Sequence, residues 1–153
     1  MTTPTTQAVA WNLGYDIHLG VTWSRFMEGL KDKKILANRC SSCERVFVPP
    51  QAYCESCFEA TDAWLELPPE GTLEVFTVAW HGFTGGPPAP YAIGGIRLDG
   101  ASTLLMHWVV GVDFDDPANV RKHLPVGSRV RAVWAEERSG QILDIAHFER
   151  IDA

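Results

Sequence analysis

The sequence predicts a mainly β protein in which an N-terminal helix precedes a four-cysteine ribbon and a five-stranded barrel. Three observations predict it: an early stripe of hydrophobic residues at helical spacing, two closely spaced cysteine pairs, and five short β-type runs in the second half. The 153 residues, 46% of them hydrophobic, suffice for one core with a small appendage. We expect an extension with a docking helix over 1–37, the ribbon over 38–67 and the barrel over 68–153.

The predicted helix runs from Asp16 to Lys31. Its hydrophobic residues share one face of a 3.6-residue period, and they are Leu19, Trp23, Phe26, Met27 and Leu30. Packing against the rest of the chain is the ordinary role of such a stripe. Because the following ribbon is too small to bury it completely, we expect the part around Trp23 and Phe26 to contact a partner chain as well.

The four cysteines form the strongest motif. Cys40 and Cys43 are separated by two residues, as are Cys54 and Cys57, and ten residues lie between the pairs. This spacing is typical of four thiolates arranged around one ion, for which zinc is the default and iron is the competing metal. A closed four-sulfur shell has no open position for water, so the sequence predicts a structural zinc ion.

The residues beside the cysteine pairs bear on charge and backbone shape. Arg39 and Arg45 flank the first pair and can offset the charge of about −2 that four thiolates leave around a divalent ion. Glycine commonly follows such a cysteine pair, but here Glu44 and Phe58 occupy those positions. We therefore expect the metal affinity to be modest.

The five β-type runs follow residue 70, with a short helix between the third and the fourth. We expect that helix to open at Asp116-Pro117 and to end near His123. This order of elements is typical of an OB-type barrel, although SH3-like barrels share its outline. The predicted strands are Leu73–Trp80, Tyr91–Leu98, Thr103–Val110, Arg129–Trp134 and Gln141–Glu149.

A loop rich in glycine and proline joins the first two predicted barrel strands. Six of its ten residues, from His81 to Pro90, are Gly or Pro, and none is Asp, Glu, Lys or Arg. It is either an ordinary surface loop or a binding loop that is stiffened by proline and open to a partner at its glycines. The candidate partner contacts here are His81, Phe83, Gly85, Gly86 and Tyr91.

Charge and hydropathy exclude several classes of protein. The formal net charge of −6 opposes binding to phosphate backbones. The longest stretch without Asp, Glu, Lys or Arg, Val75–Ile96, holds five Gly and three Pro, so no membrane span is expected. The first basic residue is Arg25, so a signal peptide is not indicated and we expect a cytoplasmic location.

No catalytic constellation is evident in the sequence. All four cysteines belong to the ribbon, which leaves no thiol elsewhere to act as a nucleophile. The G-x-S-x-G, P-loop and G-x-G-x-x-G motifs are missing, and the five histidines are scattered. We therefore expect the chain not to be catalytic by itself.

The order and identity of these motifs resemble the DUF35 family, also called the OB-fold acyl-CoA-associated proteins. The likeness extends from about residue 22 to 150. The residues that carry it are Phe26-Met27-Glu28-Gly29-Leu30-Lys31, the four cysteines, Pro49-Pro50, Trp64, Gly71-Thr72, Pro90-Tyr91 and Val126-Gly127. The resemblance implies a rubredoxin-like zinc ribbon followed by an OB barrel.

The resemblance also implies a function. Members of that family serve as small partners of thiolase-fold enzymes, including thiolases, aldolases and acyltransferases that act on CoA esters. This chain is then a noncatalytic subunit whose partner supplies the catalytic residues and which helps to bind or channel acyl-CoA. Its free-standing length suits a dedicated heteromeric thiolase. The chain is similar to the small subunit of a thiolase acting on benzoylsuccinyl-CoA, and its six tryptophans suit an aromatic acyl group.

Residues 25–45 are the net-positive stretch of this acidic chain, with six basic and three acidic side chains. Lys33, Lys34 and Arg39 are therefore candidates to meet the phosphates of coenzyme A. The alternative is a solvated surface that balances the ribbon thiolates.

Two other functions stay open at this point. OB folds and zinc ribbons both occur in proteins that bind single-stranded nucleic acid, although the basic residues of the predicted barrel strands are limited to Arg97, Arg129 and Arg131. A rubredoxin-like electron-transfer module would bind iron and be coloured.

Overall fold

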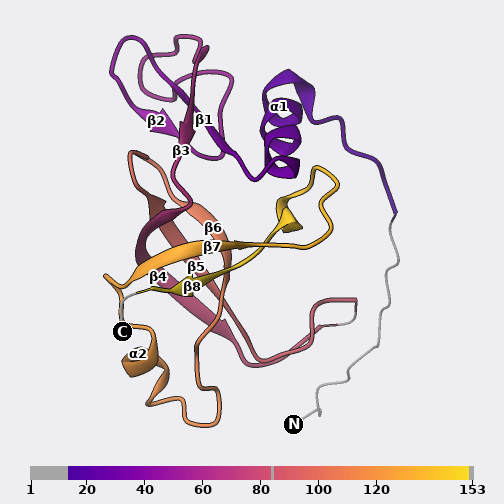
Figure 1. Ribbon diagram of the computed structural model, residues 1–153, viewed down its shortest axis with the longest axis vertical. Helices are drawn as coiled ribbons and strands as arrows, with labels where there is room; N and C mark the ends of the chain where they lie inside the picture. The colour runs from indigo at the N-terminus through magenta and orange to yellow at the C-terminus, as the bar shows by residue number, and fades with distance from the viewer. Residues whose placement is uncertain (1–13, 84, 152–153) are drawn as a thin grey trace, which may run out of the picture.

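The structure, a computed structural model, describes residues 14–83 and 85–151. Figure 1 shows the ribbon and the long helix at one end of the molecule, the barrel in the middle, and a second short helix at the other end. The expected fold class is confirmed: a four-cysteine ribbon is followed by a five-stranded barrel. No helix among the described residues is long and apolar enough to cross a membrane.

The first helix, α1, is shorter than expected. It spans Gly20–Lys31 instead of beginning at Asp16. Gly20 has φ +67°, which an α-helix cannot continue through, and Leu19 before it offers no side-chain cap. The hydrophobic stripe therefore extends one residue beyond the helix, to Leu19, because the backbone at Gly20 does not continue the helical turn.

The ribbon contains a small antiparallel sheet of strand order β2-β1-β3. Strand β1 is Ile35–Arg39, β2 is Val46–Phe47 and β3 is Ala63–Leu67. The five residues of β1 pair in full with β3, from Ile35 opposite Leu67 to Arg39 opposite Ala63. The cysteine pairs lie in the loops at the ends of this sheet.

The barrel is closed, with strand order β4-β5-β6-β8-β7. Its strands are β4 Glu70–Ala79, β5 Tyr91–Leu98, β6 Leu105–Val109, β7 Arg129–Trp134 and β8 Ile145–Arg150. The last strand begins later than expected, because Ile142–Asp144 form a 3₁₀ turn, η1, first. The helix α2 is also shorter than expected, at Val120–His123, because Asp116 accepts a hydrogen bond from the Ala118 N–H and forms a turn instead.

One continuous hydrophobic core joins α1, the ribbon sheet and the barrel. Phe26 and Leu30 of α1 belong to the same cluster as Leu73, Ile96 and Phe148 of the barrel. The loop between β7 and β8 closes over the helix end, where Arg138 Nε donates to the Lys31 carbonyl at 2.9 Å. The barrel therefore supplies the packing surface that the ribbon lacks. Whether the three segments expected from sequence are separate domains stays a prediction.

Candidate metal centre and partner surface

The four cysteines converge from two equivalent turns. In the first, the Glu44 N–H donates to the Cys40 carbonyl at 3.0 Å, and in the second the Phe58 N–H donates to the Cys54 carbonyl at 2.9 Å. All four Sγ atoms lie within 4.8 Å of one another. The turns thus bring residues more than ten positions apart to one point.

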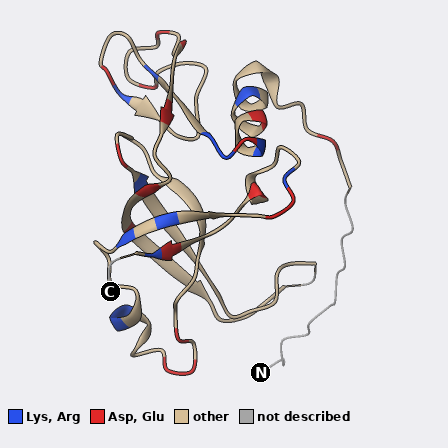
Figure 2. Ribbon diagram, in the orientation of Figure 1, with Lys and Arg blue, Asp and Glu red and all other residues tan. Residues whose placement is uncertain are grey.

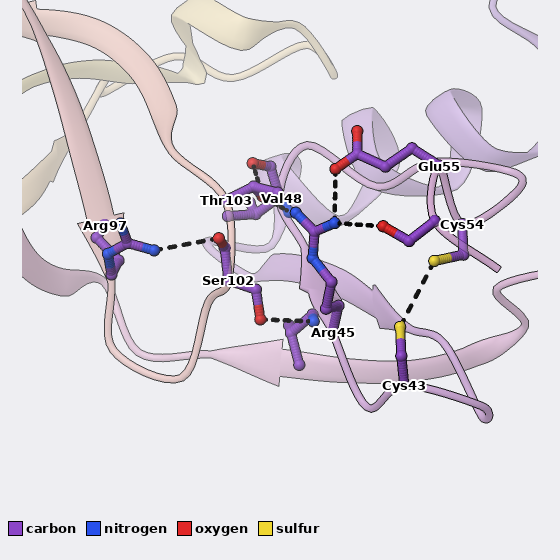
Figure 3. Close-up of polar contacts among 10 residues, drawn as sticks. Cys43, Arg45, Val48, Cys54, Glu55, Arg97, Ser102 and Thr103 are labelled. Atoms are coloured by element: carbon purple, nitrogen blue, oxygen red, sulfur yellow. Dashed lines mark hydrogen bonds and ion pairs between the residues drawn. The ribbon is translucent and has the colours of Figure 1, made fainter.

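The donor set fits a tetrahedral ion. Zinc–sulfur bonds of about 2.3 Å require sulfur–sulfur edges of about 3.8 Å, and the Cys43 and Cys54 Sγ atoms lie 3.6 Å apart (Figure 3). None of the four cysteines is in a disulfide. When bound, zinc would act as a cross-link, because four thiolates fill its shell.

The thiols titrate as a group rather than singly. Burial opposes ionisation of Cys54, but backbone N–H groups of Cys57 and Ser56 that point at its sulfur outweigh this and lower its pKa to about 7. The side chain of Cys43 and burial raise the pKa of Cys57 to about 12. Without a cation the cluster thus holds some thiols protonated, and a metal ion would displace those protons.

The two positions that lack glycine adopt a left-handed backbone. Glu44 has φ +61° and Phe58 has φ +58°. A residue with a Cβ pays about 1–2 kcal/mol in this region. Phe58 is also 82% exposed, so its ring gains little from packing within the chain. Modest metal affinity stays a prediction, and this strain is its physical basis.

The two arginines beside the first cysteine pair bind carboxylates of the ribbon. Arg45 Nη1 reaches Glu55 at 2.7 Å and Ser56 Oγ at 3.0 Å, which ties the first cysteine turn to the second (Figure 3). Arg39 pairs with Glu44 at 2.9 Å. Both guanidinium groups are thus paired with carboxylates, and the expectation that they offset thiolate charge stays a prediction.

A seam of hydrogen bonds fixes the ribbon to the barrel. Ser102 Oγ accepts from the Val46 N–H at 3.0 Å, and Thr103 Oγ1 accepts from the Val48 N–H at 2.8 Å. Thr103 also donates to the Val48 carbonyl at 2.9 Å, and Arg97 holds the Ser102 carbonyl at 3.1 Å (Figure 3). This seam is not predictable from local sequence, because the residues that it joins across the ribbon and barrel lie about 55 positions apart and no local pattern marks them.

A buried amide was missed as well. Asn38 of β1 has no exposed surface. Its Nδ2 donates to the carbonyls of Gln51 and Thr61 at 2.5 and 2.8 Å, and its Oδ1 accepts from the Gln51 N–H at 3.2 Å. These bonds anchor the loop that carries the second cysteine pair. A lone polar residue inside an apolar strand was the available signal.

The basic residues proposed for coenzyme A do not form one cluster. Lys33 and Lys34 lie exposed in the turn after α1, whereas Arg39 lies at the far end of β1 and pairs with Glu44. Five residues of extended chain separate Lys34 from Arg39, which is about 16 Å. Of the three, the two lysines are the ones without a carboxylate partner among the described residues.

The helical stripe proposed as a partner contact divides into a buried part and an exposed part. Phe26 is fully buried in the core, so its surface is unavailable to another chain. Trp23 is 39% exposed and packs edge-on against Phe26, with ring centroids 6.1 Å apart. On α1, therefore, the surface that a partner chain could contact consists of Trp23 and the exposed residues before it.

The loop over 81–90 and the neighbouring strands form an uncharged surface. His81 and Gly85 are exposed, Gly86 is half-buried, and Phe83 is 67% exposed. Figure 1 places this loop away from α1, so the two proposed contacts lie on separate parts of the molecule. In Figure 2 the loop carries neither blue nor red.

The same lack of charge continues over the outer face of β4, β5 and β6 as far as the ion pair between Glu74 and Arg97, which borders it. Residues 75–96 and 100–112 contain no Asp, Glu, Lys or Arg. Register places Val75 opposite Gly95 and Gly95 opposite Met106, so these three lie in line on one face. Trp108 follows on that face and stacks on Tyr91 at 6.1 Å. We call this surface the uncharged face; its exposed apolar residues are Val75, Met106, Trp108 and Val110.

His107 lies on the opposite, inner side of β6. Burial lowers its pKa, and its Nδ1 accepts from the Trp108 N–H at 2.9 Å. Its Nε2 lies 3.1 Å from the Ile142 carbonyl, so a neutral ring protonated at Nε2 satisfies both contacts. This geometry fits the structural role that a histidine in a strand usually has.

Comparison with known proteins places these features in a family. Residues 27–62 match the rubredoxin-like zinc ribbon domain of ChsH2, and residues 64–135 match the C-terminal OB-fold domain of ChsH2. No curated protein matches the chain.

Two solved structures share the fold. A DUF35-family protein of unknown function from Sulfolobus solfataricus is 25% identical with a TM-score of 0.61, over 86% of this chain and 84% of that one. The Ltp2-ChsH2(DUF35) aldolase is 20% identical with a TM-score of 0.59, over 83% of this chain and 92% of that one. Together with the two domain matches, these similarities show that the chain belongs to the DUF35 family of ChsH2-type proteins.

Proposed function

We propose that this protein is a noncatalytic subunit of a CoA-dependent enzyme complex. In this proposal a thiolase-fold partner, which is a thiolase, an aldolase or another acyltransferase, supplies the catalytic residues, and acyl-CoA is the substrate. The structural neighbour whose name pairs Ltp2 with a DUF35 chain as an aldolase supports a two-component arrangement. The reducing cytoplasm, which keeps ribbon thiols free for metal, is the location we propose.

The uncharged face is the observation that carries this proposal. Met106 is 55% exposed and Val75 is 49% exposed. Residues 75–96 and 100–112 around them carry no Asp, Glu, Lys or Arg, and the Glu74–Arg97 ion pair borders this surface at one end. Depletion of charge with exposed aromatic residues and methionine is typical of the centre of a protein interface. We therefore propose that this face, with Phe83 and Tyr91 at its loop end, contacts the catalytic subunit.

Coenzyme A, in this proposal, contacts the two lysines that have no carboxylate partner among the described residues. Lys33 and Lys34 project from the turn between α1 and the ribbon, and we propose that they meet the phosphates of the coenzyme while the acyl group enters the partner. Double charge reversal, Lys33→Glu with Lys34→Glu, is expected to weaken acyl-CoA binding to the assembled complex. Unchanged affinity in a binding titration would remove coenzyme contact from the proposal and leave the partner contact standing.

The experiment that tests the partner contact begins with capture of the tagged chain from its native source. The bound protein is identified by mass spectrometry and then expressed for reconstitution. Met106→Lys places a charge at the centre of the uncharged face and is expected to weaken the complex by about tenfold or more. Gln141→Lys adds the same charge on the exposed loop near α1 and serves as the control. Equal affinity for both variants would contradict the proposed interface.

The alternative of single-stranded nucleic-acid binding draws no support from the barrel surface. Such sites combine stacking aromatic residues with a basic groove that follows the phosphates. The uncharged face has the aromatic residues, but the arginine that borders it, Arg97, is already paired with Glu74.

A further inference from the structure

One edge of strand β4 is unpaired over most of its length. Strand β7 pairs with β4 only from Glu70 to Thr72, and the last bonds on that side join Leu73 to Gly127 and Ser128. From Glu74 to Ala79 the strand has β5 as its partner on one side, and no described residue pairs with its other side. In an antiparallel strand every second residue points its N–H and C=O away from its neighbour, so this edge presents free donors and acceptors.

This edge forms one wall of a groove of about 620 Å³. Five consecutive residues of β4, from Glu74 to Val78, line it, which indicates a groove along the strand edge, since a sheet face would contribute alternate residues. The opposite wall comes from the segment around α2, with Val120, Pro125 and Val126. The groove therefore offers backbone hydrogen bonds on one side and apolar side chains on the other.

The sequence of the edge makes a permanently bare state unfavourable. Residues 75–80 read Val-Phe-Thr-Val-Ala-Trp, with high β propensity and neither charge nor proline. Proteins usually protect such edges with lysine, proline or a bulge, because a bare apolar edge pairs with other chains. Glu74, the charge at its start, is already held by Arg97, whose Nη2 lies 2.8 Å from Glu74 Oε2.

The charge and shape of the groove select its occupant. With Glu74 neutralised, Arg121 is the remaining charged residue of the lining and has no carboxylate partner among the described residues. A second copy of this chain fits poorly, because its own β4 edge is a wall of the same groove and is faced by its own α2 segment. One extended segment of a different protein, with an acidic residue facing Arg121, satisfies the free edge, the apolar wall and the charge.

We propose that the β4 edge binds one extended acidic segment of another protein as an additional strand. This inference rests on the proposed function for the identity of that protein, which is the catalytic subunit. It goes beyond the contact at the uncharged face, because it assigns main-chain pairing to residues 74–79 and an ion pair to Arg121.

The test uses a capped octapeptide of alternating valine and threonine with one central glutamate, followed by NMR of this chain. At about 2 mM peptide, we expect shift changes along residues 74–79 and 117–126, and slower hydrogen exchange at alternate amides of that edge. The same peptide with proline in place of a central threonine lacks the required N–H and should not bind. Arg121→Gln should weaken binding by about fivefold, whereas Gln141→Lys, outside the groove lining, should leave it unchanged.

A peptide that leaves the edge amides unchanged would overturn the proposal even if a catalytic partner is found. Peptide binding without any catalytic partner would leave the edge site standing and remove the proposed function instead. In the reconstituted complex, the same alternate amides should exchange about 100-fold more slowly than in the free chain. The assignment to a partner segment would be overturned if these amides exchange in the complex at the same rate as in the free chain. It would also be overturned if deletion of residues 1–13 from the free chain made these amides exchange faster.

Discussion

The two ends of this chain are stabilised in different ways. The cysteine tip, residues 40–60, has a small cluster of its own, in which Cys40, Phe47 and Cys54 are buried, and Val46 and Val48 connect it to the shared core. The barrel shares a continuous core with α1 and the ribbon sheet, and that core includes Phe26, Leu73 and Phe148. A segment with so few apolar contacts needs a cross-link, while the barrel has hydrophobic burial of its own. This difference predicts that removal of the metal destabilises the cysteine tip, whereas a mutation in the shared core destabilises the barrel.

Removal of the metal should have the largest effect, and it should be confined to the tip. Structural zinc in small domains contributes about 10–16 kcal/mol to folding at pH 7. We expect chelation, or Cys40→Ser, to abolish hydrogen-exchange protection over 40–60 while the amides of β5 and β6 stay protected. Metal analysis should give one zinc per chain and a colourless protein. Loss of protection throughout the barrel, or a tip unaffected by serine at Cys40, would contradict the division.

A large-to-small substitution in the shared core should have the opposite effect: it should destabilise the barrel and leave the metal site intact. Phe148 is fully buried on β8, and Phe148→Ala should lower the free energy of unfolding by about 3–5 kcal/mol. The metal content of the chain that remains folded should stay at one ion. Denaturant unfolding followed by tryptophan fluorescence measures the first quantity, and metal analysis measures the second. A matched control, Phe83→Ala on the exposed loop, should change the unfolding free energy little.

The seam between ribbon and barrel should give an intermediate effect. Thr103→Val keeps the shape of the side chain but removes the bonds to the Val48 N–H and carbonyl. Leaving these groups without partners should cost about 1–3 kcal/mol, and exchange should accelerate at Val48 before it does at the barrel strands. Thr77→Val, on the exposed part of β4, is the control. Equal effects of both substitutions would indicate that the seam contributes nothing.

The smallest expected effect is a gain in stability. Phe58→Gly removes the Cβ from a left-handed position and should stabilise the metal-bound tip by about 0.5–1 kcal/mol. Phe58→Ala removes the same exposed ring but keeps the backbone strain, so it should give no such gain. The chelator concentration at half-loss of metal distinguishes the two variants. A larger gain for alanine than for glycine would show that the ring, not the backbone, carries the cost.

Local signals predicted the chemistry and most elements of this fold. Cysteine spacing identified the four thiols that the structure brings together, and alternation identified the barrel strands, because both depend on residues close in sequence. The predicted start of the helix was wrong, because the hydrophobic periodicity continues on the N-terminal side of Gly20 whereas the helical backbone does not. The seam at Thr103, the buried Asn38 and the free edge of β4 all depend on contacts between distant segments, and no periodicity records these.

The central claim is that this chain supports chemistry performed by a partner. Its most direct test is turnover of a CoA thioester by the purified catalytic subunit, by this chain, and by the reconstituted complex, under identical conditions. We expect no turnover by this chain and substantially faster turnover by the complex than by the catalytic subunit alone. Turnover by this chain unaided, or equal rates with and without it, would contradict the account.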